Sequence, residues 1–152
     1  MKMSLSGKKG LSILEILVFI LLISVLMIGI SYLTVYTLRN SRYIQNKTKA
    51  TRYAQQLHEW LAGQKEKNWV DFVGSLSETT YCIDTIADSI ATISSQQGAC
   101  TGYDIQSLFK RELIISDINS DTTEIRYKIL VKWRDGANVG QVSLSSSQAV
   151  VE

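Results

Sequence analysis

The sequence predicts an α+β protein in which a long N-terminal helix packs on a small antiparallel β-sheet. Three observations support this class. Residues 16–38 are uncharged and apolar, residues 39–67 repeat apolar side chains at the helical period, and residues 107–145 contain three strand-like runs separated by turn formers. At 152 residues the chain has room for one folded domain, residues 68–152, beyond such a helix.

The apolar run is long enough to cross a bilayer. From Ile16 to Leu38 there are 23 consecutive uncharged residues, which span roughly 35 Å as a helix against a hydrocarbon core of about 30 Å. It is longer than the apolar part of an ordinary secretory signal, and no small-x-small cleavage site follows it. After Lys9 the next basic residue is Arg39. The positive-inside rule therefore predicts a single-pass protein with its C-terminal part outside the cytoplasm.

One acid, Glu15, lies at the start of this run. An ionised carboxylate deep in hydrocarbon costs about 2.5–3.5 kcal/mol on insertion scales. Glu15 is either a boundary residue that reaches back to water, or a group that meets a positive partner inside a protein assembly, where pairing offsets desolvation. Its position alone does not separate these two interpretations.

The residues before the acid carry a resemblance. Lys8-Lys9-Gly10-Leu11-Ser12-Ile13-Leu14-Glu15 resembles the processing site of type IV prepilins and type II secretion pseudopilins: a short basic leader, a glycine, an acid five residues later and a long apolar run. The resemblance covers about a quarter of the chain. It implies that residues 1–10 are a leader cut after Gly10, that Leu11 becomes the N-methylated first residue, and that Glu15 is the fifth mature residue. Many members have Phe where this chain has Leu11.

The resemblance also implies a fold and a function. It implies the pilin fold, with residues 11–38 as a transmembrane and filament-core helix, and a structural role as a minor pilin or pseudopilin without catalytic activity. The implied partners are other pilin or pseudopilin subunits, a prepilin peptidase, an inner-membrane assembly platform and the lipid bilayer. The implied location is the cytoplasmic membrane and then an extracellular or periplasmic filament. In that filament Glu15 would neutralise the new α-amine of a neighbouring subunit. An uncleaved single-span protein whose outer domain binds a ligand or scaffolds an envelope complex is the alternative.

Residues 39–67 extend the helix as an amphipathic segment. Its predicted contact stripe has side chains three or four residues apart: Tyr43, Lys47, Ala50, Ala54, Leu57 and Leu61. We expect this stripe, with Trp60 beside it, to pack on the globular domain. Residues 68–77 read as a loop whose Trp69, Phe72 and Val73 fill the seam between helix and sheet.

The sheet is predicted from the later part of the chain. Residues 79–85 have strand-like composition, and residues 86–107 are predicted to be irregular. Three strands follow at 107–118, 124–134 and 139–145, with turns at 119–123 and 135–138. One face of the middle strand is apolar: Ile125, Tyr127, Ile129, Val131 and Trp133. The run Val131-Lys132-Trp133-Arg134, followed by a glycine-containing turn and a V-x-L strand, also resembles minor pilins of the V type and pseudopilins of the I type, less specifically.

Cys82 and Cys100 are the two cysteines, both beyond the apolar run. An oxidising exterior favours a disulfide between them over two free thiols or a metal pair. His58 is the one histidine, lies on the predicted helix and is expected to be solvated, so it completes no zinc set. The aspartates of the second half show no calcium-loop order. We therefore predict no metal site.

The charge balance and the absence of catalytic motifs argue against a nucleic-acid-binding protein and against an enzyme. The whole chain carries a formal charge of +2, and removal of Lys2, Lys8 and Lys9 with the leader would leave 13 basic against 14 acidic side chains. Such a balance predicts no strong nucleic-acid surface. No glycine-rich phosphate loop, G-x-S-x-G motif or Cys-His nucleophile arrangement is present. The sequence thus predicts neither an enzyme nor a cofactor.

Overall fold

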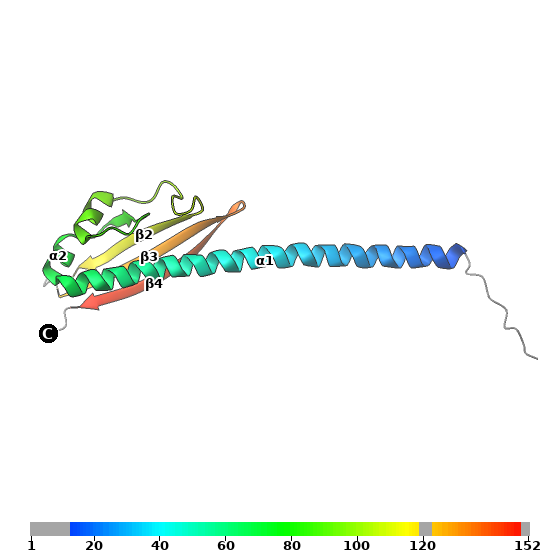
Figure 1. Ribbon diagram of the computed structural model, residues 1–152, viewed down its shortest axis with the longest axis horizontal. Helices are drawn as coiled ribbons and strands as arrows, with labels where there is room; N and C mark the ends of the chain where they lie inside the picture. The colour runs from blue at the N-terminus through cyan, green and yellow to red at the C-terminus, as the bar shows by residue number, and fades with distance from the viewer. Residues whose placement is uncertain (1–12, 119–122, 150–152) are drawn as a thin grey trace, which may run out of the picture. The chain divides into compact units, whose positions relative to one another are not determined.

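A computed structural model describes residues 13–118 and 123–149. The chain divides into two compact units, residues 1–41 and 42–152. Helix α1 (Ile13–Lys67) begins in the first unit and ends in the second. The second unit continues with α2 (Trp69–Gly74), β1 (Thr80–Cys82), the 3₁₀ helix η1 (Ile90–Gln96), β2 (Phe109–Ile118), β3 (Glu124–Asp135) and β4 (Asn138–Ala149) (Figure 1).

In the first unit, the described residues form helix without interruption and every side chain from residue 13 to 41 is exposed. The helix continues through Gly29, where an added Cβ would meet no other atom within 4 Å. This part of α1 is long and apolar enough to cross a membrane. The predicted membrane-spanning character of the segment is therefore supported, and its first predicted residues, 11 and 12, lie outside the described part.

The sheet of the second unit is antiparallel and has four strands in the order β1-β2-β3-β4. The α+β class is thus confirmed. β3 and β4 form a hairpin in which Asp135 pairs with Asn138 across a two-residue turn. Gly136 opens this turn with φ 62°, the left-handed value that the first position of a type II′ turn requires and that glycine adopts without steric cost.

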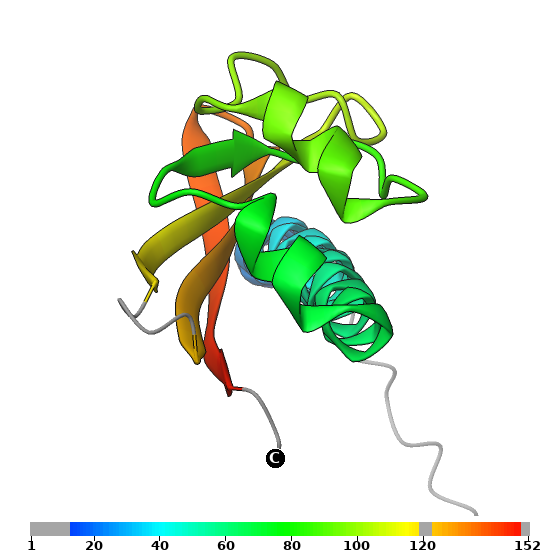
Figure 2. The ribbon, with the colours of Figure 1, turned by 90° about the vertical axis from the view of Figure 1, so that its left-hand side faces the viewer.

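The core lies between one face of this sheet and the C-terminal part of α1, seen end-on in Figure 2. The helix contributes the predicted stripe, of which Ala50, Ala54, Leu57 and Leu61 are buried. The sheet contributes the predicted face of β3, on which every second side chain is buried: Ile125, Tyr127, Ile129, Val131 and Trp133. The stripe thus combines the small Ala50 and Ala54 with the larger Leu57 and Leu61, which fill more of the core one to three turns later.

Aromatic rings of α1 and of the sheet pack against one another in this core. Trp133 is fully buried, and its ring centroid lies 5.7 Å from that of Tyr43 and 6.5 Å from that of Phe109. Its indole also covers Gly140 of β4, where any Cβ would collide with the ring. Gly140 is therefore a requirement of close packing rather than of backbone conformation.

The structure corrects several details of the sequence prediction. The predicted loop at 68–77 contains α2, because the Asn68 side chain caps its N-terminus by accepting from the backbone N–H groups of Val70 and Asp71. The predicted irregular stretch 86–107 contains η1, capped in the same way by Ser89. β1 is shorter than predicted, and β4 extends beyond residue 145 to Ala149.

The start of β2 also differs from the predicted residue 107. Gln106 and Ser107 adopt left-handed conformations with φ of 52° and 55°, so the chain turns there before the strand begins at Phe109. Leu108 N–H donates to the Ile105 carbonyl and closes this turn at 3.2 Å. Strand composition alone does not signal such a turn, because neither residue is a glycine or an asparagine.

Candidate functional site

The exposed apolar part of α1 is the main candidate interaction surface. Its large side chains are 43–79% exposed from Ile13 to Leu38. Its serine and threonine hydroxyl groups are compatible with this apolar character, because each donates to the carbonyl four residues earlier at 2.8–2.9 Å: Ser24, Ser31, Thr34 and Thr37. A helix that satisfies its own polar groups in this way suits a hydrocarbon environment.

Glu15 lies in the first turn of α1, which begins at Ile13, and its side chain is exposed. A negative charge there interacts favourably with the helix dipole. Across the described residues, no basic group forms an ion pair with Glu15, and the nearest basic residue along the helix is Arg39, roughly 36 Å away. A counter-charge for Glu15 within an apolar environment must therefore come from residues 1–12 or from another molecule. The predicted processing residues, Gly10 and Leu11, lie outside the described part of the chain.

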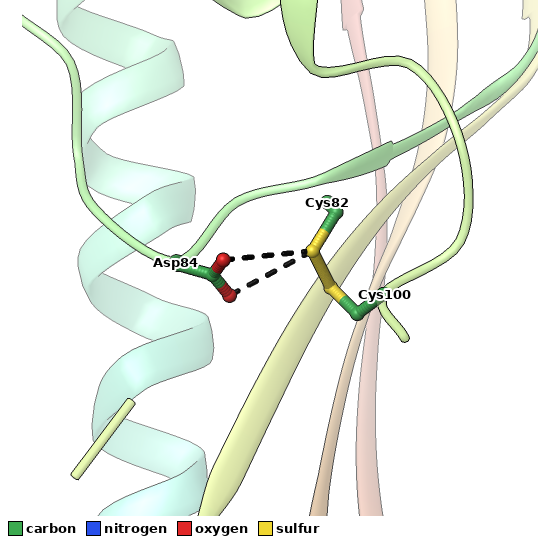
Figure 3. A group of neighbouring side chains, drawn as sticks. All are labelled: Cys82, Asp84 and Cys100. Atoms are coloured by element: carbon green, nitrogen blue, oxygen red, sulfur yellow. Dashed lines mark hydrogen bonds between the residues drawn. A yellow bond between two sulfur atoms is a disulfide. The ribbon is translucent and has the colours of Figure 1, made fainter. Parts of the chain in front are cut away.

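The second predicted feature, the disulfide, is present. Cys82 at the end of β1 and Cys100 form an S–S bond with a Cα–Cα distance of 4.9 Å (Figure 3). The bond closes the connection that contains η1 and holds it against β2. Cys100 is buried and its sulfur lies 3.4 Å from the carbonyl oxygen of Arg111. The cross-link thus ties the least regular part of the fold to the sheet.

Asp84 approaches the disulfide but forms no hydrogen bond with it. The two carboxylate oxygens lie 3.7 and 3.8 Å from Cys82 Sγ, as the dashed lines in Figure 3 mark. A disulfide sulfur carries no proton, so these are contacts without a donor. Cys82, Cys100 and Asp84 place potential metal-ligand atoms within 4.8 Å of one another. The S–S bond removes both thiolates from that group, and a carboxylate alone makes a poor metal site.

Arg111 of β2 lies next to the disulfide and connects β2 with α1 and with the segment after β1. Its side chain is almost completely buried, and it donates from Nε to the Ile83 carbonyl and from Nη1 to the Tyr53 carbonyl of α1, both at 3.0 Å. Burial lowers the pKa of this guanidinium to about 10, while the nearby Asp84 acts in the opposite direction. Burial, together with the charge of Asp104, raises the pKa of the Asp84 carboxyl. Arg111 thus fastens helix, sheet and disulfide-closed connection together.

A hollow of about 290 Å³ lies beside Arg111. Its other lining residues come from α1 and from the segments around the disulfide: Tyr53, Gln56, Asp84, Thr85, Ile86 and Ile105. The opposed charges of Arg111 and Asp84 lie along it without forming an ion pair within 4 Å of each other. No arrangement of nucleophile, base and orienting group is assembled there.

Sequence reasoning missed the environment of His58. Instead of being solvated, its ring is half-buried, and its Nδ1 lies 2.8 Å from the Tyr127 hydroxyl. Gln148 of β4 donates from Nε2 to the same hydroxyl at 2.9 Å. Burial raises the pKa of the Tyr127 phenol, while hydrogen bonds with Ser146 and Gln148 act against this rise. One sequence signal could have indicated this contact. Tyr127 lies on the apolar face of β3, and a buried tyrosine hydroxyl needs a hydrogen-bond partner in the core.

No family model matches this chain, and comparison with curated proteins and with solved structures finds no match. The architecture of a long N-terminal apolar helix and a small antiparallel sheet is compatible with a pilin-like fold.

Proposed function

We propose that this chain is a structural subunit, a minor pilin or pseudopilin, of a type IV pilus or type II secretion-like filament. The observation that carries the proposal is Glu15: a single exposed acid in the first turn of an otherwise uncharged apolar helix segment, with no cation to pair with it among the described residues. A filament of parallel subunits supplies the missing cation as the α-amine of a neighbour.

The proposed maturation creates that amine. Cleavage of the peptide bond after Gly10 by a prepilin peptidase releases the basic leader and leaves Leu11 as a methylated N-terminus. The amine then lies four residues before Glu15 in its own chain. Two subunits with a small axial offset bring the amine of one beside the carboxylate of the other, so each neutralises a charge that is costly in hydrocarbon.

The rest of the molecule suits display on such a filament. The exposed apolar surface of residues 13–38 supports packing among like helices after departure from the bilayer, and the disulfide supports a folded unit on the oxidising side of the membrane. The chain acts through assembly, without catalysis of its own. Assembly uses an inner-membrane platform and takes place at the cytoplasmic membrane.

The N-terminus of the protein purified from its own organism tests the proposal. Mass spectrometry is expected to find methylated Leu11 as the first residue. The Gly10→Val variant is expected to retain residues 1–10, whereas the control Gly29→Val, which has space for the added side chain, matures normally. An intact Met1 in the wild-type protein would contradict the proposal and favour an uncleaved membrane-anchored protein.

A second experiment tests the role of Glu15. The Glu15→Gln variant removes the charge at nearly constant size and is expected to be inserted and cut but to be depleted from sheared filaments about tenfold or more, since one unpaired buried charge costs over 1.4 kcal/mol. The matched Glu15→Asp variant keeps the charge and is expected to incorporate far better. Equal incorporation of Glu15→Gln and wild type would rule out the pairing.

A further inference from the structure

Strand β4 is an open edge of the sheet. It is the last strand in the order, and all 12 of its residues pair with β3 in an unbroken register. No strand within the described part of the chain pairs with its other side. Proteins protect such edges with charges, prolines or bulges, but residues 138–149 contain no charged residue and no proline, and their ladder has no irregularity.

The opposite edge of the sheet is protected. β1 has only three residues, and its outer side is covered by the connection that the disulfide closes. Tyr81 forms a bridge with Gln97, and the Gly98 N–H donates to the Thr80 carbonyl at 2.7 Å. The same sheet therefore has one short, covered edge and one long, uncovered edge.

The turn geometry determines which β4 groups are unpaired. In a two-residue hairpin the flanking pair, here Asp135 and Asn138, exchanges both backbone hydrogen bonds, and the bonded pairs then alternate. Arg134 N–H accordingly donates away from β4, to Leu108 of the β2 side. The β4 residues whose N–H and C=O groups point to the open edge are the odd-numbered ones: Val139, Gln141, Ser143, Ser145 and Ser147.

The two faces beside this edge differ in chemistry. On the core face, Val142 and Leu144 are only partly buried and pack at the margin of the hydrophobic core. On the outer face, β4 carries small serines beside the basic residues of β3. Ser145 pairs with Lys128, which forms no ion pair with any described residue, whereas Lys132 binds Glu112 at 3.0 Å and Arg126 binds Glu124 at 3.2 Å.

This outer face has a positive balance. Its basic side chains exceed its acidic ones by two: Lys110, Arg126, Lys128, Lys132 and Arg134 against Glu112, Asp117 and Glu124. A strand added to β4 would lie two strand spacings, about 9.6 Å, from β3. The Lys128 side chain and an acidic side chain of the added strand, extended toward each other across the small Ser145, can together cover that distance, so an acid on the added strand is the complementary group.

We propose that the β4 edge binds an extended segment of another protein by strand addition, and that this segment alternates apolar residues on the core face with acidic residues on the outer face. Backbone hydrogen bonds to the odd-numbered residues hold the segment. Val142 and Leu144 set the apolar register, and Lys128 selects carboxylates. A second copy of this chain fits less well, because its own β4 offers no carboxylate to Lys128.

Amide hydrogen exchange on the full chain in detergent micelles tests the proposal. The probes are two nine-residue capped peptides, one alternating Val with Glu and the other alternating Val with Lys. The Val/Glu peptide is expected to slow exchange of the odd-numbered β4 amides by about tenfold or more. The even-numbered amides, which already bond to β3, are expected to change little. The Val/Lys peptide is expected to give no protection.

Two variants test separately the roles of the open β4 edge and of the Lys128 charge. Ser145→Pro removes an outward N–H without removing a bond to β3 and is expected to abolish protection. Lys128→Glu keeps the edge and is expected to weaken Val/Glu binding at least about fivefold and to admit the Val/Lys peptide, whereas Lys67→Glu on exposed α1 changes the net charge equally and leaves binding unchanged.

Three results would overturn the proposal. Absence of protection with either peptide would show that the edge accepts no strand. Equal protection by both peptides would show that the edge does not select a segment with acidic side chains. Protection that appears without peptide and increases with protein concentration would identify a second copy of the chain as the occupant.

Discussion

Removal of the Cys82–Cys100 disulfide is expected to destabilise the folded unit by about 3 kcal/mol. The two cysteines are 18 positions apart, and the chain-entropy relation for a loop of this length gives roughly 3 kcal/mol at 25 °C. For a folded unit of about a hundred residues, each kcal/mol lowers the melting temperature by about 4 °C or more, so we expect a decrease of roughly 12 °C.

The assay is urea unfolding of the full chain in detergent micelles, followed by tryptophan fluorescence. All three tryptophans lie in residues 42–152, so the signal reports the folded unit alone. The variant is Cys82→Ala with Cys100→Ala, and the wild type with reductant is a second route to the same state. The control Ser94→Ala with Ser95→Ala changes two exposed residues inside the closed connection without opening it.

A loss below about 1 kcal/mol in both the variant and the reduced protein would refute the chain-entropy argument. It would mean either that residual contacts already restrict the connection in the unfolded ensemble, or that the connection loosens in the folded state once the bond is removed. In the second case the reduced protein is expected to exchange the Gly98 amide, which donates to the Thr80 carbonyl, faster than the oxidised protein does.

Other consequences follow from packing, pH and turn geometry. Gly140→Ala is expected to cost about 1–3 kcal/mol, because the added methyl group collides with Trp133; the neighbouring exposed Ser143→Ala is the control, and urea unfolding measures both. The raised pKa of Tyr127 means that the folded state keeps its proton when the unfolded state has lost it. The contribution of Tyr127 to the free energy of unfolding is therefore fully present below pH 10 and is lost as pH rises through the pKa of the folded state. Tyr127→Phe is expected to flatten this part of a stability–pH curve. Ser107→Gly is expected to raise stability by about 1 kcal/mol, because it relieves a left-handed conformation, and an unchanged melting temperature would contradict this.

Periodicity was sufficient to predict the main elements. The alternation from Ile125 to Trp133 identifies the buried face of β3, and the spacing of Ala50, Ala54, Leu57 and Leu61 identifies the buried side of α1, because both follow from the repeat of a single regular element. The cysteine pair was predicted from compartment chemistry and is bonded in the structure. For the two periodic elements the deciding information lies within a short stretch of sequence.

Features that depend on contacts distant in sequence were not predictable in this way. The partner of His58 is 69 positions away in Tyr127, and the carbonyls that bind Arg111 belong to residues 28 and 58 positions away. The α2 helix was missed for a local reason, since its six residues are too few for a periodic signal and only the Asn68 cap marks it. The open edge of β4 is likewise a property of strand order, which no single strand reveals.

The hairpin of β3 and β4 gives the sheet a property useful for engineering. Its register is fixed at one end by a two-residue turn that depends on Gly136, and two pairs further along by the contact of Trp133 with Gly140. Neither constraint involves the 83–99 connection. Foreign peptides grafted between the bridged cysteines, for instance as displayed antigens, should therefore leave the alignment of these two long strands intact.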